Sequence, residues 1–221
     1  MRVGGKDIEA VVFDMDGVLY DTESISMKSW NEAGKQMSVP DIGQTALDCI
    51  GMNRKGMFDY FYQKYGKDFP VEEFLDRTRA LSRAVIEREG VPVMKGAKEV
   101  LECLTMKGLP LALASSTRRV TVLQHLEETG FRKYFRVVIC GDMVENSKPA
   151  PDIYEMACRE LGVAPKKAVA VEDSFNGIRS AHAAGMLPLM VPDMVLPSEE
   201  IQRLLWEKCD SLFEVIRLFS D

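Results

Sequence analysis

The chain has 221 residues, of which 46% are hydrophobic and 28% are charged, and its formal net charge is −6. This composition excludes a disordered chain, and the length predicts one large domain or a domain that carries an insertion. The acidic balance argues against a nucleic-acid partner, because phosphate backbones are bound through an excess of lysine and arginine. A small anionic substrate remains compatible with this charge if a few cations or a metal ion gather at one site.

Neither membrane insertion nor secretion is expected. No apolar run approaches the length of a membrane span. The first ten residues, MRVGGKDIEA, lack the apolar core of a signal peptide. The five cysteines are odd in number, scattered and without a CxxC pair, so we expect reduced thiols. These features predict a cytoplasmic protein, and a monomer is the default expectation for its oligomeric state.

Short apolar segments alternate with helical patterns along the chain. Five such segments predict strands buried on both faces of a parallel sheet: Ile8–Phe13, Leu109–Ala114, Val137–Cys140, Ala168–Val171 and Leu187–Val191. Between the strands, apolar residues recur with helical spacing, as in the segment 97–104, where they stand at i, i+3, i+4 and i+7. The alternation predicts an α/β fold with a Rossmann-like, doubly wound parallel sheet.

One spacing is too long for a simple core of this kind. Asp16 and Ser115 are 99 residues apart, whereas a strand–helix–strand unit needs about 30 residues. The surplus contains no convincing strand and instead shows four helical patterns, at Asp21–Met37, Gly43–Ile50, Asn53–Tyr65 and Val71–Glu89. We therefore expect residues 22–91 to form an inserted α-helical cap domain, and residues 1–21 and 92–221 to form the α/β catalytic core.

Polar residues stand where the predicted strands end. In chain order they are Asp14 and Asp16, Ser115, Lys148, and Glu172 with Asp173. Taken singly, each is most simply a solvated turn residue, a helix cap or a surface lysine. However, ligands of open α/β sheets bind outside the carboxyl ends of the strands. Four acids gathered at one edge require a cation between them, and their hard oxygen atoms favour Mg²⁺.

Four segments carry a resemblance to a known family. VVFDMDGVLYDTES (Val11–Ser24), ASST (Ala114–Thr117), SKPAPDIY (Ser147–Tyr154) and VEDSFNGIRSAHAAGM (Val171–Met186) resemble the haloacid dehalogenase superfamily. They are similar in particular to the branch that contains β-phosphoglucomutase and small sugar-phosphate phosphatases. The resemblance covers nearly the whole chain. It implies that the helical insertion is the cap of that branch, which opens and closes over the site.

The resemblance implies a role for each residue of the first two motifs. Asp14 matches the nucleophile, which forms an aspartyl-phosphate and so divides hydrolysis into two easier steps. Asp16 matches the general acid and base. Ser115 matches the hydroxyl that holds the phosphoryl group, and the backbone N–H groups of Ser116 and Thr117, at the N-terminus of the next helix, complete an anion site.

The later motifs imply the remaining groups. Lys148 matches the lysine that neutralises the nucleophile and the phosphoryl charge. Mg²⁺ is expected to bind Asp14, the backbone carbonyl of Asp16, and Asp173 with the help of Glu172. Asn176, in the last motif, is a further substrate-binding candidate. One departure is a serine before Lys148, where many relatives have glycine.

These motifs are compatible with three functions. The family's dehalogenases and phosphonatases carry no aspartate at the position of Asp16, which favours phosphoryl transfer from an oxygen leaving group. We therefore expect a Mg²⁺-dependent phosphatase acting on a small phosphorylated metabolite, a sugar phosphate above all. The alternatives are a β-phosphoglucomutase-type isomerase and a non-catalytic binding or regulatory protein. The last is disfavoured, because no catalytic position is missing.

The predicted cap bears on the choice between phosphatase and mutase. CIGMNRKGM (Cys49–Met57) resembles the mutase cap motif, in which the arginine matched by Arg54 follows the glycine matched by Gly51 and holds a distal phosphate. Ten residues after Asp16 the mutase has a histidine, but this chain has Ser26. We predict that Arg54 orients a polar or anionic substrate group. Without the histidine, water should reach the aspartyl-phosphate, so hydrolysis should prevail.

Overall fold

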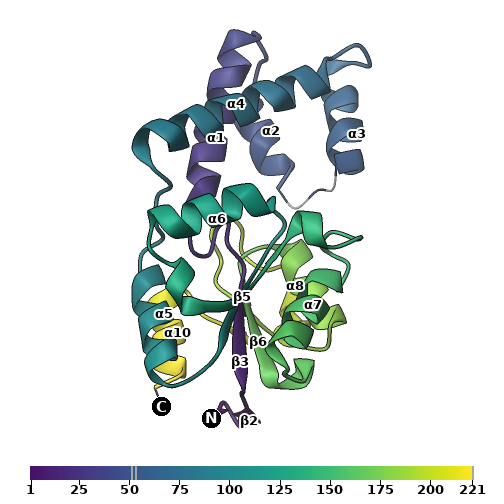
Figure 1. The fold of residues 1–221 in the computed structure, drawn as a ribbon. Helices are drawn as coiled ribbons and strands as arrows, with labels where there is room; N and C mark the ends of the chain where they lie inside the picture. Colours follow the sequence, from purple (N-terminus) through teal and green to yellow (C-terminus); the bar gives the residue numbers. More distant parts are fainter. Residues whose placement is uncertain (51, 53, 221) are drawn as a thin grey trace. The chain divides into compact units, whose positions relative to one another are not determined.

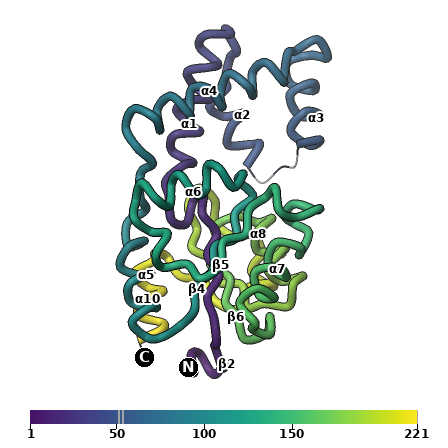
Figure 2. Tube along the Cα trace, in the orientation of Figure 1, coloured from purple at the N-terminus to yellow at the C-terminus, as the bar shows by residue number. Residues whose placement is uncertain are grey.

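The computed structural model describes residues 1–50, 52 and 54–220, which form two compact units. One, here called the α/β unit, comprises Met1–Asp21 and Val93–Asp221, and the other, the helical unit, comprises Thr22–Pro92. Figure 2 follows the chain out of the α/β unit after its first long strand and back into it. The outgoing and returning segments are paired where Tyr20 faces Val93 and the Met94 N–H donates to the Leu19 carbonyl at 2.9 Å.

A six-stranded, wholly parallel sheet forms the centre of the α/β unit, as predicted. Its strands are β3 (Ala10–Phe13), β4 (Leu111–Ser115), β5 (Phe135–Cys140), β6 (Ala168–Glu172), β7 (Leu187–Met190) and β8 (Glu207–Lys208). They lie in the order β5-β4-β3-β6-β7-β8. β8 was not predicted, since its two residues are charged and exposed. A hairpin of β1 (Arg2–Val3) and β2 (Lys6–Asp7) was also missed.

Helices cover both faces of this sheet. The unit contains α5 (Ala97–Met106), α6 (Arg119–Glu128), α7 (Asp152–Leu161), α8 (Phe175–Ala183), α9 (Glu199–Gln202), α10 (Leu212–Leu218) and three short 3₁₀ turns, η1 (Arg132–Tyr134), η2 (Gly141–Met143) and η3 (Pro165–Lys167). In Figure 1, α5 and α10 lie on one side of the sheet and α7 and α8 on the other. Alanines of β3, β4 and β6 pack against α7 and α8, and their small side chains let the helices approach closely. The strands are therefore buried on both faces.

The helical unit has an aromatic core of its own. Its helices are α1 (Thr22–Gln36), α2 (Ile42–Asp48), α3 (Arg54–Tyr65) and α4 (Val71–Glu89), and the prediction of helices without strands holds for its described residues. α1 packs against α4, and the Trp30 ring meets the Phe74 ring edge-on at 5.2 Å between centroids. Phe61 stacks on Phe69 at 5.3 Å. No helix among the residues described is long and apolar enough to cross a bilayer.

The strand order fixes where a ligand would bind in the α/β unit. From β3 the chain proceeds to β4 and β5 on one side, and then crosses to β6 on the other side of β3. The direction of winding therefore reverses between β3 and β6. In open α/β sheets, ligands bind at this reversal, outside the carboxyl ends of the strands.

Candidate active site

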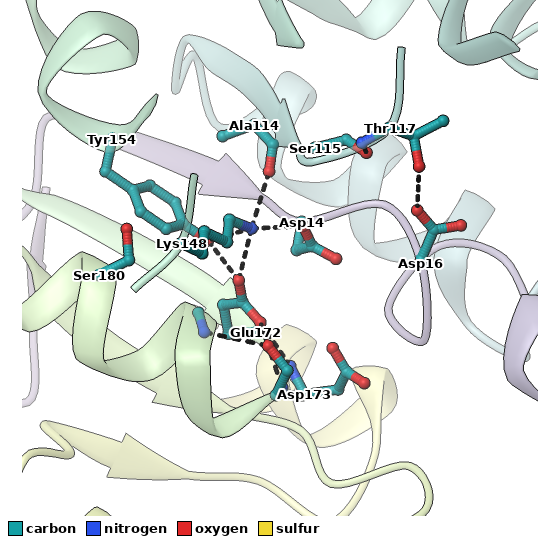
Figure 3. Close-up of polar contacts among 12 residues, drawn as sticks. Asp14, Asp16, Ala114, Ser115, Thr117, Lys148, Tyr154, Glu172, Asp173 and Ser180 are labelled. Atoms are coloured by element: carbon teal, nitrogen blue, oxygen red, sulfur yellow. Dashed lines mark hydrogen bonds and ion pairs between the residues drawn. The ribbon is translucent and has the colours of Figure 1, made fainter. Parts of the chain in front are cut away.

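The reversal between β3 and β6 gathers side chains from four segments (Figure 3). Asp14 follows β3 directly, and its N–H donates to the Val171 carbonyl of β6 at 2.9 Å, which ties the two strand ends together. Ser115 ends β4, and Glu172 ends β6 with Asp173 next to it. Lys148 comes from the loop between η2 and α7. The sheet thus brings most of the predicted core residues to one edge.

Lys148 lies at the centre of the charged group. Its Nζ donates to Asp14 Oδ1 at 2.5 Å, to Glu172 Oε1 at 2.6 Å and to the Ala114 carbonyl at 3.0 Å. An ammonium has three protons, so these three short contacts can use all of them, and the Tyr154 hydroxyl is a fourth, longer acceptor at 3.3 Å. The Lys148 side chain is only 7% exposed, and the ion pairs therefore lie in an environment where solvent screens them little.

The buried charges do not balance. Burial raises the pKa of Asp14 to about 8, because the charged form loses its hydration; Lys148 opposes the rise, and Glu172 and Asp16 add to it. Burial lowers the pKa of Lys148, but the carboxylates of Asp14 and Glu172 outweigh it, so the net pKa lies above the usual value and the ammonium stays charged. One cation therefore faces two carboxylates, and the excess negative charge favours a further cation.

Glu172 is fixed through both of its oxygen atoms. Oε1 accepts from Lys148 and from the Tyr154 hydroxyl at 2.8 Å. Oε2 accepts from the Asp173 N–H at 3.2 Å, and from the Ser174 N–H and hydroxyl at 3.2 and 3.0 Å. α8 approaches so closely that a Cβ on Gly177 would lie 1.7 Å from Oε1. The side chain is fully buried, and its charged partner there is Lys148.

The donor set fits a hard divalent cation. Asp14, Glu172 and Asp173 each offer a carboxylate oxygen, and the three atoms lie within 4.8 Å of one another. Such oxygen ligands, together with the excess negative charge, suit Mg²⁺. Gly17 keeps Asp173 near the loop after β3, because a Cβ there would lie 2.3 Å from Asp173 Oδ2. The Asp16 carboxylate is not part of this cluster.

Asp16 is instead turned toward Thr117, whose hydroxyl donates to Asp16 Oδ2 at 2.9 Å (Figure 3). The Ser115 hydroxyl is fully buried and accepts from the Thr117 N–H at 3.1 Å. The prediction that Ser116 and Thr117 form the N-terminus of a helix is wrong, because α6 begins only at Arg119. The hydrogen bond to Ser115 closes a local turn in place of a first helical turn.

The remaining candidates lie elsewhere. Asn176 is a half-buried residue in the first turn of α8. In the helical unit, Arg54 is 60% exposed, forms an ion pair with Glu72 and lies over the Phe58 ring at 5.1 Å. Ser26 is a half-buried residue of α1, and Gly51 lies outside the described residues. The substrate-binding roles of Asn176 and Arg54 stay predictions.

Sequence reasoning missed Tyr154. This residue of α7 is fully buried, and its hydroxyl lies 3.3 Å from Lys148 Nζ as well as 2.8 Å from Glu172 Oε1. Burial raises the pKa of Tyr154 well above its usual value, and the Glu172 charge adds to the rise, so the hydroxyl stays a donor. The available signal was a hydroxyl-bearing residue on the apolar face of a helix, six positions after Lys148.

A family model and a known relative place this chain in the same protein family. The model of the haloacid dehalogenase-like hydrolases matches residues 11–191. A phosphorylated carbohydrates phosphatase of Thermotoga maritima is 32% identical over 179 residues, which cover 81% of this chain and 82% of that protein.

Two solved structures are similar over nearly the full length. A hydrolase of this family from Deinococcus radiodurans, with bound phosphate and sodium, is 29% identical with a TM-score of 0.77, covering 95% of this chain and 93% of its own. A CbbY variant from Rhodobacter sphaeroides, in complex with xylulose-1,5-bisphosphate, is 28% identical with a TM-score of 0.72, covering 94% and 96%.

Proposed function

Because the chain belongs to the haloacid dehalogenase-like hydrolase family, we propose that it is a Mg²⁺-dependent phosphatase. Its substrate is a small phosphorylated metabolite of the sugar-phosphate class, and the reaction passes through an aspartyl-phosphate. The observation that carries the proposal is the buried Asp14 carboxylate, held by Lys148 at 2.5 Å beside the acidic pair Glu172 and Asp173. A cytoplasmic monomer that binds neither nucleic acid nor membrane remains the accompanying prediction.

In the first half of the proposed reaction, a carboxylate oxygen of Asp14 attacks phosphorus and the bond to the leaving oxygen breaks. Asp16 gives its proton to that oxygen, which departs as the alcohol. Lys148 lowers the pKa of Asp14 against the larger effect of burial, and its positive charge offsets that of the incoming phosphoryl group. The Ser115 hydroxyl and the N–H of Ser116 orient the phosphoryl oxygens, and the Thr117 hydroxyl holds Asp16.

In the second half, Asp16 takes a proton from water as the water oxygen attacks phosphorus. The bond between phosphorus and the Asp14 oxygen breaks, and inorganic phosphate leaves. Asp14, Asp173 and the backbone carbonyl of Asp16 would hold Mg²⁺, which would supply positive charge to neutralise the nucleophile and the phosphoryl group. Glu172, whose two oxygens already accept hydrogen bonds, supports this set by fixing Lys148.

The substrate class is supported by the relatives' names and by the molecules bound in the solved structures. The Thermotoga relative is a phosphatase of phosphorylated carbohydrates, and the Rhodobacter neighbour holds a sugar bisphosphate. The Deinococcus neighbour binds phosphate itself. Together these support a sugar-phosphate substrate.

The test is release of inorganic phosphate from p-nitrophenyl phosphate and from a panel of sugar phosphates, with Mg²⁺ and with excess chelator. We expect release with Mg²⁺, loss of activity in chelator and recovery when Mg²⁺ is restored. Full activity in excess chelator would contradict the metal role, and no release from any ester would contradict the phosphatase.

A separate measurement tests the mutase alternative. β-Glucose 1-phosphate is supplied with a catalytic amount of the bisphosphate, and both products are followed. Because Ser26 stands where the mutase has a histidine, we expect free phosphate to accumulate faster than glucose 6-phosphate. The reverse order would identify a mutase.

A further inference from the structure

Tyr154 makes a contact with the charged group that none of the assigned roles requires. Its side chain is fully buried, and its hydroxyl donates to Glu172 Oε1 at 2.8 Å. The same oxygen lies 3.3 Å from Lys148 Nζ, and the ammonium lies 4.9 Å from the centre of the Tyr154 ring. One side chain thus touches both members of the Lys148–Glu172 ion pair, as Figure 3 shows.

Tyr154 and Lys148 differ in how firmly the fold holds their side chains in place. Lysine is a flexible chain with a compact charge at its end. Tyr154, by contrast, is part of α7, whose residues Ile153, Ala157 and Leu161 pack in the main core. The packing of α7 therefore fixes the position of the Tyr154 ring, and the rigid ring fixes the position of the hydroxyl oxygen. A fixed donor at this point holds Glu172 Oε1, while the turn after β6 holds Oε2, and the same hydroxyl contacts the end of Lys148 directly.

A count of hydrogen bonds shows what the hydroxyl contributes. Lys148 Nζ has four acceptors within reach of its three protons: Asp14 at 2.5 Å, Glu172 at 2.6 Å, the Ala114 carbonyl at 3.0 Å and, longest, the Tyr154 hydroxyl at 3.3 Å. Among the described residues, the donors to Glu172 Oε1 are Lys148 and Tyr154, whereas Oε2 is occupied by the turn after β6. Without the Tyr154 hydroxyl, Oε1 would keep Lys148 as a donor but lose the bond that the fold fixes, and the loss of a hydrogen bond to a buried charged oxygen is unfavourable.

We propose that Tyr154 is a positioning residue whose hydroxyl holds Glu172 so that Lys148 is directed at Asp14. The residue itself touches neither substrate nor the reacting atoms. Its effect on turnover rests on the proposed function, but its effect on Lys148 does not. The substitution Tyr154→Phe is selective, because it keeps the ring and removes only the oxygen.

The direct test observes the Lys148 ammonium by NMR in protein labelled with ¹⁵N-lysine, with Lys148→Met to assign the signal. A buried, fully bonded ammonium exchanges its protons slowly with water. We expect Tyr154→Phe to raise the exchange rate about tenfold or more, since a hydrogen bond to a charged group is lost. The matched control is Tyr20→Phe, which removes another fully buried hydroxyl, bonded to Thr129 at 2.8 Å, and should leave the Lys148 signal unchanged.

The kinetic test uses p-nitrophenyl phosphate with Mg²⁺. We expect Tyr154→Phe to lower kcat about tenfold or more while KM stays within about threefold, and Tyr20→Phe to change neither. Melting temperatures of both variants control for loss of fold. Lys148 exchange within about threefold of wild type in Tyr154→Phe, or an equal change in Tyr20→Phe, would overturn the proposal. Should wild type release no phosphate at all, the proposed function would fail and the NMR result would still decide the role of Tyr154.

Discussion

At the scale of single residues, the α/β unit contains one unfavourable group of buried charges, at the carboxyl ends of β3 and β6. Asp14 and Glu172 both face Lys148, so one carboxylate is left without a full counter-charge in a buried place. Desolvated charges of this kind destabilise a fold. They also occur where a nucleophile or a metal ligand is needed, because such groups must be ready before the substrate arrives. Burial above all, with the charges of Glu172 and Asp16 adding to it, raises the pKa of Asp14 to about 8.

Asp14→Asn should therefore stabilise the metal-free protein at alkaline pH. Because the pKa of Asp14 rises from 3.8 to about 8 on folding, the folded state holds the proton more tightly. This favourable contribution is present below the lower value and is lost as pH rises through the higher one. Asparagine has the same shape and cannot ionise. We expect its free energy of unfolding, from urea titration in chelator, to exceed that of wild type by about 1 kcal/mol or more near pH 8.

The same comparison near pH 5 supplies the control. Folded wild type then keeps the proton on Asp14, so the advantage of asparagine should be clearly smaller than near pH 8, and it should vanish only below the unfolded pKa of 3.8. A wild type that is more stable than Asp14→Asn near pH 8, or a difference that does not vary with pH, would contradict the charge imbalance described here.

At the scale of elements, the turns after the strands place the acids, and glycines make these turns possible. Gly17 follows Asp16 with a φ of +76°, and its missing side chain leaves room for Asp173. Gly177 does the same for Glu172 at the start of α8. In each case the space that a Cβ would fill is occupied by a carboxylate. Substitution there should act on the site and not only on the backbone.

Gly17→Ala and Gly108→Ala separate the two effects. The φ values are +76° and +75°, so both alanines suffer the same left-handed strain, on the order of 1 kcal/mol. Nothing lies within 4 Å of a Cβ at Gly108, whereas Asp173 Oδ2 lies at 2.3 Å from one at Gly17. Both variants should lose similar stability in thermal melts, but only Gly17→Ala should lower kcat/KM for phosphate release, by about tenfold or more. Equal kinetic losses would refute the role of the carboxylate contact.

The sequence allowed these elements to be predicted where the local pattern was strong. The apolar runs of β3 to β7 predict a parallel sheet, and the strand ends then indicate Asp14, Lys148 and Glu172. β8 could not be found, since Glu207 and Lys208 give no apolar signal. The delayed start of α6 depends on the Ser115 hydroxyl, which takes the N–H of Thr117. The bond from Thr117 to Asp16 joins residues 101 positions apart, so no local pattern contains it.

At the scale of the whole molecule, the two units have different contents. The α/β unit contains the acids, the lysine and the buried serine of the proposed chemistry. The helical unit contributes an aromatic core and exposed charged residues, Arg54 among them. Arg54 is paired with Glu72 at the surface, and exposed pairs contribute little stability. If Arg54 has a function, binding of a substrate group is the predicted one.

Arg54→Ala should accordingly act on substrate recognition and not on stability. We expect KM to rise severalfold for a sugar phosphate with a second polar or anionic group, and to stay nearly constant for p-nitrophenyl phosphate, which offers no such group. The matched control is Arg79→Ala, since Arg79 is 56% exposed and pairs with Asp76 in the same unit. Unfolding free energies of both variants should lie within about 1 kcal/mol of wild type. A KM that rises equally for both substrates, or equally in Arg79→Ala, would contradict the prediction.

Turnover by Asp14→Asn tests the central claim most directly. Phosphate release from p-nitrophenyl phosphate is measured with Mg²⁺ for wild type and for this variant, and the urea titration checks that the variant is folded. The nucleophilic role of Asp14 predicts a loss on the order of a thousandfold or more in a protein that is as stable as wild type or more so. A folded Asp14→Asn protein that releases phosphate at close to the wild-type rate would contradict the mechanism.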